Sequence, residues 1–216
     1  MPTLQRIREA LRSYEAATVT AGDRRVAAVA IVLRDGVGGP EVLLIERATR
    51  EGDPWSGHMA FPGGRMDDID RDPRAAAERE TREEVGIDLA QAELLGRIDD
   101  MEGHHAAASS MVISAFAFYM RDPGPLSLLS SEVREAVWFP LGSLLDPEVH
   151  VDYPVRRFGV RSLPGLRVGA PESQVVWGLT YKFLEILLRV VGHPLPDRWR
   201  DVPPEVRPPG ARESVR

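Results

Sequence analysis

Hydrophobic residues recur at helical spacing near the start of the chain, at Leu4, Ile7 and Leu11, and Tyr14 continues the row. Steps of three and four residues place these side chains on one face of an α-helix. The polar residues between them occupy the opposite face. We therefore predict an amphipathic N-terminal helix that packs either on the rest of the domain or on a partner chain.

Short hydrophobic runs bounded by turn residues follow, and they predict β-strands. The clearest is "RRVAAVAIVLRDGVGGPEVLLIERA", which is typical of a buried strand, a glycine-rich turn and a second strand. Further strands are expected at residues 59–61, 94–99, 112–119 and 136–139, and a less distinct pair is expected between residues 149 and 168.

Two further helices are predicted from their end signals. Asp72 stands at an N-cap position, Pro73 at the first helical position and Gly86 just past the end of the first helix. The second helix is expected to run from near Ser173 to Gly192, with apolar residues along one face. Three helices among many strands predict an α/β or α+β fold with a mixed sheet.

Composition limits the organisation and the kind of partner. The chain has 216 residues, of which 43% are hydrophobic, and this favours one domain with appendages. We predict an N-terminal helix in residues 1–23, a central domain in 24–192 and a Pro- and Arg-rich tail in 193–216. The tail is either extended or attached to the core through Trp199. The additions to the central domain could build a homodimer interface.

The net charge of −6 argues against a general nucleic-acid binder, since affinity for a phosphate backbone requires clustered Lys and Arg. The lack of cysteine excludes disulfides, a thiolate nucleophile and a Cys-based zinc site. No apolar run is long and uncharged enough for a membrane span, and the first residues lack a secretory h-region. A cytoplasmic protein without a membrane partner is the default expectation.

The segment "ERETREEVG" is the main candidate for chemistry. On a helix, Glu80, Glu83 and Glu84 project within an arc of about 100°, where like charges repel one another. The upstream "FPGG" allows a tight turn that exposes backbone atoms beside the helix. Carboxylate and carbonyl oxygens in such an arrangement suit Mg²⁺ or Mn²⁺. The alternative is a solvated helix face, which is the common meaning of an acidic run.

The same segment resembles the Nudix box of the Nudix hydrolases. "RETREEVGI" matches the second half of that signature, except that Thr81 occupies an apolar position. In the first half, Asp70 replaces the usual Glu, and eight rather than seven residues separate it from Arg79. This variation is similar to the coenzyme A pyrophosphatase-like branch of the family.

The resemblance implies a Nudix fold, an α/β/α sandwich around a mixed β-sheet. It also implies metal-dependent hydrolysis of a nucleoside diphosphate linked to another group. Residues matched by position would bind one to three Mg²⁺ or Mn²⁺ ions, and Arg79 would orient Glu83. The implied metal ligands are Glu80, Glu83, Glu84 and the Gly64 carbonyl, and the candidate catalytic bases are Glu80, Glu102 and Glu132.

Three residues ahead of the box are candidate substrate contacts. Arg47 could meet a phosphate or pair with a carboxylate, while Trp55 and His58 could contact a base or belong to the core. A coenzyme A-like substrate is favoured, although Ala48 and the "DPWSG" segment depart from that branch. ADP-ribose, nucleoside diphosphate sugars and nucleoside triphosphates are alternatives, and a non-catalytic ligand-sensing module is the alternative of another class.

Overall fold

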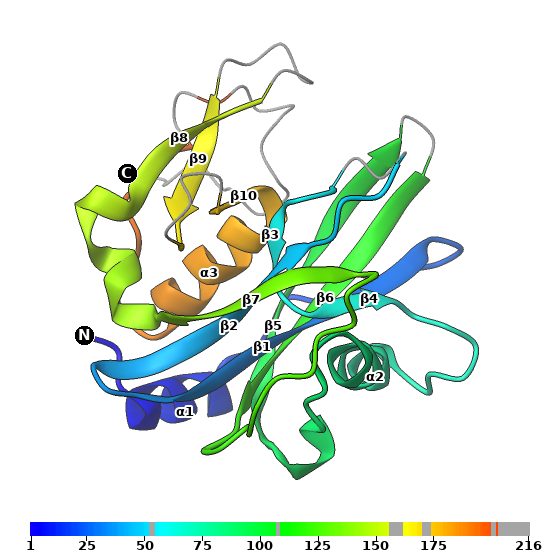
Figure 1. The fold of residues 1–216 in the computed structure, drawn as a ribbon, viewed down its shortest axis with the longest axis horizontal. Coiled ribbons are helices and arrows are strands. Elements are labelled where there is room, and N and C mark those ends of the chain that lie inside the picture. The colour runs from blue at the N-terminus through cyan, green and yellow to red at the C-terminus, as the bar shows by residue number, and fades with distance from the viewer. Residues whose placement is uncertain (52–54, 107–108, 156–161, 170–173, 200–201, 203–216) are drawn as a thin grey trace.

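The computed structural model describes residues 1–51, 55–106, 109–155, 162–169, 174–199 and 202 (Figure 1). In this part of the chain, seven strands form a mixed sheet in the order β3-β2-β1-β6-β5, with β4 on β1 and β7 on β2. A smaller sheet has the order β10-β9-β8. The bounds of the strands are β1 Arg25–Gly36, β2 Gly39–Arg47, β3 Met59–Ala60, β4 Gly63–Arg65, β5 Glu93–Ala106, β6 Ser109–Tyr119, β7 Val133–Pro140, β8 His150–Pro154, β9 Ser162–Arg167 and β10 Val175–Trp177.

The centre of the main sheet is β1, which pairs parallel with β6 and antiparallel with β2 and β4. Strands β1 and β2 form the predicted hairpin and pair only near its tip, from Leu33 to Val42. Beyond the tip, β3 pairs with β2 and β4 pairs with β1. The "FPGG" segment therefore fills the gap where the hairpin strands diverge.

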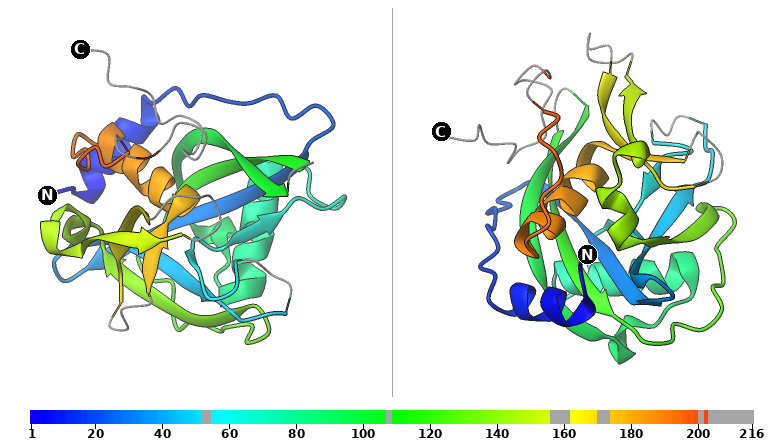
Figure 2. Two further views of the ribbon diagram at one scale, coloured as in Figure 1. Left: turned by 90° about the horizontal axis from the view of Figure 1, so that it is seen from above. Right: turned by 90° about the vertical axis from the view of Figure 1, so that its left-hand side faces the viewer.

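Hydrophobic clusters cover both faces of the main sheet. Helix α2, Pro73–Val85, packs on one face through Ala76, Ala77 and Val85. The other face packs against α1, Leu4–Arg12, against α3, Gly178–Val190, and against the smaller sheet. Figure 2 shows α1 and α3 next to each other on the side away from α2. This arrangement confirms the α/β class and the sandwich around a mixed sheet.

The N-terminal helix packs on its own domain, which decides between the two predicted alternatives. Ile7 and Leu11 are fully or almost fully buried in the hydrophobic cluster that also contains residues of α3. The helix begins with Thr3 as N-cap, whose side chain accepts a hydrogen bond from the Arg6 amide. Tyr14 lies beyond the helix end and donates a hydrogen bond to Asp99 at 2.7 Å.

Two strands were missed by the prediction, and one helix begins later than expected. Residues 175–177 pair with β9 as strand β10, so α3 begins at Gly178 and not near Ser173. Valines at the start of that segment suit a strand as well as a helix, and pairing with β9 decides between them. Strand β4 was missed because glycines at 63 and 64 are typical of a turn.

Part of the predicted tail packs against the core. Leu195, Trp199 and Val202 are almost fully buried, and the Trp199 ring meets Tyr181 edge to face at 5.6 Å. Residues 203–216 of the tail lie outside the described residues. Among the helices that the structure describes, none combines the length and the hydropathy needed to cross a bilayer.

Candidate active site

Local sequence signals determine the ends of helix α2, and its one buried hydroxyl bonds within the helix. The Asp72 carboxylate accepts a hydrogen bond from the Ala75 amide at 2.8 Å, and Gly86 ends the helix with a φ of 78°. Thr81, which stands where the Nudix signature has an apolar residue, is fully buried. Its hydroxyl donates to the Ala77 carbonyl at 2.7 Å, so the polar group is satisfied within the helix.

Glu84 is buried between helix α2 and the "FPGG" turn. Its exposure is only 2%, and one carboxylate oxygen accepts a hydrogen bond from the Gly63 amide at 2.9 Å. Burial raises the pKa of Glu84 to about 8, although the Gly63 amide and the positive charge of Arg47 act in the opposite direction. The "FPGG" turn thus touches the helix through a buried carboxylate.

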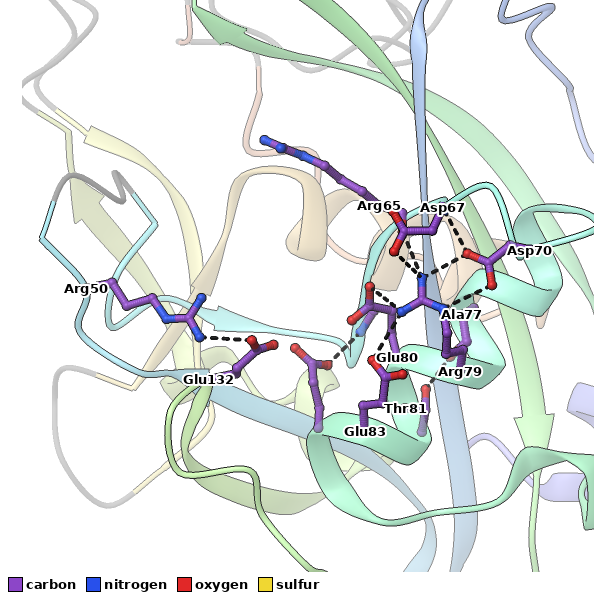
Figure 3. A network of polar contacts seen from close by, with 12 residues as sticks. Arg50, Arg65, Asp67, Asp70, Ala77, Arg79, Glu80, Thr81, Glu83 and Glu132 are labelled. Atoms are coloured by element: carbon purple, nitrogen blue, oxygen red, sulfur yellow. Dashed lines mark hydrogen bonds and ion pairs between the residues drawn. The ribbon is translucent and has the colours of Figure 1, made fainter.

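Arg79 is the centre of the polar network shown in Figure 3. Its guanidinium donates two hydrogen bonds to Asp70, at 2.8 and 3.0 Å, and one to the Arg65 carbonyl at 3.1 Å. It also donates to Glu80 at 3.0 Å and to Glu83 at 3.1 Å. The same contacts hold the pKa of Asp70 below its ordinary value. Asp70, at the altered position of the box, therefore anchors the arginine that holds two glutamates.

Three carboxylates from two parts of the chain meet beside α2. Oxygen atoms of Glu80, Glu84 and Glu132 all lie within 4.8 Å of one another, and we call this group the carboxylate cluster. Glu132 comes from the segment before β7. Burial also raises the pKa of Glu80, and the neighbouring Glu83 and Glu132 add to the shift. Such a set of hard oxygen donors fits Mg²⁺ or Mn²⁺, because a divalent cation removes the repulsion among them.

Two of the implied metal ligands lie beside the carboxylate cluster. Glu83 has a half-exposed side chain and bonds to Arg79, so it is adjacent to Glu80 without belonging to the cluster. Gly64 packs directly against Glu80, because a Cβ atom at Gly64 would lie 2.4 Å from a Glu80 carboxylate oxygen. Any side chain at position 64 would therefore displace the Glu80 carboxylate.

The three candidate substrate contacts lie at or near the end of β2. Arg47 closes β2, and its charge acts on Glu84. Trp55 is partly exposed, at 36%. His58 meets the Trp177 ring edge to face at 4.8 Å, and Trp177 in turn stacks on Tyr153. His58 is therefore part of an aromatic cluster that joins β3 to the smaller sheet.

Among the described residues, Glu102 does not belong to the carboxylate cluster. It lies within β5 and forms an ion pair with Arg24. Sequence reasoning also missed Arg50, which donates a hydrogen bond to Glu132 at 2.9 Å. No local pattern could have found that contact, because the two residues are far apart in the chain.

These features define an α/β protein with a candidate divalent-metal site, and the comparisons with known proteins agree with that class. The family model for the NUDIX domain matches residues 23–157. The human mitochondrial coenzyme A diphosphatase NUDT8 (Homo sapiens) is 30% identical over 165 residues, which cover 76% of this chain and 69% of that protein. The chain therefore belongs to the Nudix hydrolase family.

Two other similarities cover different shares of the relatives. An uncharacterised protein of Schizosaccharomyces pombe is 42% identical over 113 residues, which cover 50% of this chain but only 34% of that protein. The crystal structure of a MutT/nudix family protein from Enterococcus faecalis superposes with a TM-score of 0.50 at 16% identity. It covers 88% of this chain and 75% of that one, and at this identity the likeness concerns the fold alone.

Proposed function

We propose that the chain is a metal-dependent pyrophosphohydrolase that cleaves the diphosphate of a nucleoside diphosphate linked to another group. The observation that carries this proposal is the carboxylate cluster, which gathers oxygens of Glu80, Glu84 and Glu132 within 4.8 Å. Bound Mg²⁺ or Mn²⁺ would neutralise diphosphate oxygens and activate a water molecule there. Membership of the Nudix hydrolase family supports the same reaction class.

Each residue of the site has a proposed role in this reaction. Glu80, Glu84 and Glu132 would supply carboxylate oxygens to the cation, and Glu83 and the Gly64 carbonyl are further candidates beside them. Arg79 holds Glu80 and Glu83 in place through its hydrogen bonds to both. A carboxylate oxygen of Glu80 or Glu132 takes the proton of the attacking water, and both residues stay open as the catalytic base.

A coenzyme A-like substrate is the favoured choice within this class. The human relative carries the name coenzyme A diphosphatase, and it aligns with three quarters of this chain. Arg47, Trp55 and His58 are the proposed substrate contacts, since Arg47 ends β2 and the other two lie between β2 and β3. Ala48 and the "DPWSG" segment keep ADP-ribose, nucleoside diphosphate sugars and nucleoside triphosphates as alternatives.

The test is a turnover assay of the purified chain with Mg²⁺ or Mn²⁺ against coenzyme A, ADP-ribose, a nucleoside diphosphate sugar and a nucleoside triphosphate. Hydrolysis of coenzyme A should yield adenosine 3′,5′-bisphosphate and 4′-phosphopantetheine. Glu80→Gln should remove most of the rate. If none of these compounds is hydrolysed although one of them binds, the chain is a ligand-sensing module and the proposal fails.

The cytoplasmic location and the homodimer expected from the sequence remain predictions. The human relative is named as mitochondrial, so the location needs its own measurement by cell fractionation. Light scattering of the purified chain would give the oligomeric state.

A further inference from the structure

Glu132 is the member of the carboxylate cluster that does not belong to α2, and another segment holds it. The Ala48 amide donates a hydrogen bond to the Glu132 carbonyl at 2.8 Å. The Arg50 side chain donates to the Ser131 carbonyl through Nε at 2.9 Å. It also donates to Glu132 Oε1 through Nη2 at 2.9 Å (Figure 3). Residues just after β2 therefore determine where this carboxylate lies.

Arg50 is itself fixed by a contact that does not involve Glu132. The Ser56 hydroxyl accepts a hydrogen bond from the Arg50 amide at 2.9 Å and donates one to the Arg50 carbonyl at 2.9 Å. One hydroxyl thus holds both backbone groups of the arginine. The Arg50 backbone therefore has a fixed position, although the Arg50 side chain is about half exposed.

The contact occupies one oxygen of Glu132 and leaves the other available. Oε1 accepts from Arg50, whereas Oε2 has no hydrogen bond to any residue in the described ranges. A carboxylate that is held by one oxygen cannot rotate freely, so its second oxygen keeps one direction. The two-point contact through Nε and Nη2 requires the planar fork of a guanidinium, which a lysine ammonium does not have.

We propose that Arg50 is a positioning residue for Glu132, which holds one carboxylate oxygen so that the other serves the carboxylate cluster. The inference rests on the proposed function, in which this cluster binds the metal ion. Arg50 affects the reaction by orienting Glu132 and does not contact the substrate. Ser56 supports the same action by fixing the Arg50 backbone.

The experiment measures Mn²⁺ affinity by electron paramagnetic resonance titration of Arg50→Lys, which keeps the charge and removes the fork. We expect Mn²⁺ affinity to fall by about 10-fold, as is typical when the partner of a metal ligand is lost. In a Glu132→Gln background, the same substitution should have no further effect. Ser56→Ala should weaken Mn²⁺ binding in the same direction without changing any charge.

A matched control lies on β7. Arg134 forms a 2.9 Å ion pair with Glu46, which is outside the carboxylate cluster. Arg134→Lys should leave Mn²⁺ affinity unchanged, and melting temperatures of all variants show whether they fold. In an active protein, Arg50→Lys should lower kcat and leave KM unchanged, because the arginine does not touch the substrate.

Three results of the Mn²⁺ titrations would overturn the inference. The first is an Mn²⁺ affinity of Arg50→Lys that equals that of the wild type. The second is a double variant whose loss of Mn²⁺ affinity is the full sum of the losses of Arg50→Lys and Glu132→Gln. The third is no Mn²⁺ binding by the wild type. A raised KM with unchanged kcat would also overturn it, because Arg50 would then bind substrate. If no diphosphate is hydrolysed but the Mn²⁺ coupling is present, the proposed function fails and this inference stands.

Discussion

Replacement of Glu84 by Gln should make the metal-free protein more stable. Glu84 is 2% exposed, and its pKa is raised to about 8 from an ordinary value near 4.5, with burial as the main cause. Gln has nearly the same shape, carries no charge and can still accept the hydrogen bond from the Gly63 amide. The variant therefore avoids the free energy of placing an ionisable carboxyl in the core.

The magnitude follows from the two pKa values. A raised pKa means that the folded state holds a proton that the unfolded state releases, so stability falls as pH rises from 4.5 to 8. The raised pKa of Glu84 therefore lowers the free energy of unfolding of the wild type by about 3 kcal/mol at pH 7 and by about 1 kcal/mol at pH 5. For a chain of this length, 3 kcal/mol corresponds to roughly 6–12 °C in melting temperature.

Differential scanning calorimetry with EDTA and with Mg²⁺ tests this reasoning. The gain of Glu84→Gln over wild type in EDTA should be small at pH 5 and larger at pH 7. Mg²⁺ at 100 times its Kd should stabilise the wild type by about 2.7 kcal/mol, and the variant should gain much less. Glu83→Gln, with a half-exposed side chain, is the control and should change metal-free stability by less than about 1 kcal/mol. If Glu84→Gln melts below wild type in EDTA, or gains as much from Mg²⁺, the reasoning is wrong.

Three further outcomes are expected. Gly64→Ala should fold but bind Mn²⁺ about 10-fold more weakly, because its Cβ would displace the Glu80 carboxylate. Gly63→Ala should instead fail to fold stably, since its φ is 149° and its Cβ would lie 2.3 Å from the Ala28 carbonyl oxygen; a melting temperature of Gly63→Ala as high as that of Gly64→Ala would contradict this expectation. Trp199→Ala should lower the free energy of unfolding by about 3–5 kcal/mol in urea denaturation, because the ring is buried against Tyr181. A loss below about 1 kcal/mol would show that the tail does not pack in solution.

The sequence predicted helix α2 and its ends because capping acts locally. Asp72, Pro73 and Gly86 need no information from distant residues, and all three act as expected. The longest strands were also predictable, since hydrophobic runs of that length have few alternatives. Strand β10 was not, because three residues become a strand only when β9 is beside them.

In the candidate site, too, local features could be predicted and contacts between distant residues could not. The crowding of Glu80 and Glu84 follows from helical spacing, and the family resemblance added their implied role. The sequence could not show that Glu84 is buried, because its burial depends on the path of the "FPGG" turn. The links between Glu132, Arg50 and the cluster depend on how β2 pairs with β7, which no local pattern encodes.

The N-terminal helix has a consequence for the size of the unit that folds. The family model begins at residue 23 and ends at 157, yet Ile7 and Leu11 lie in the same core as α3. The Arg6 guanidinium also donates a hydrogen bond to the Val191 carbonyl at 2.9 Å, which ties the first helix to the end of the last. A fragment cut at the family boundaries would expose the hydrophobic face that these helices cover. The hydrophobic core thus extends beyond the residues that the family model matches, and α1 and α3 complete it.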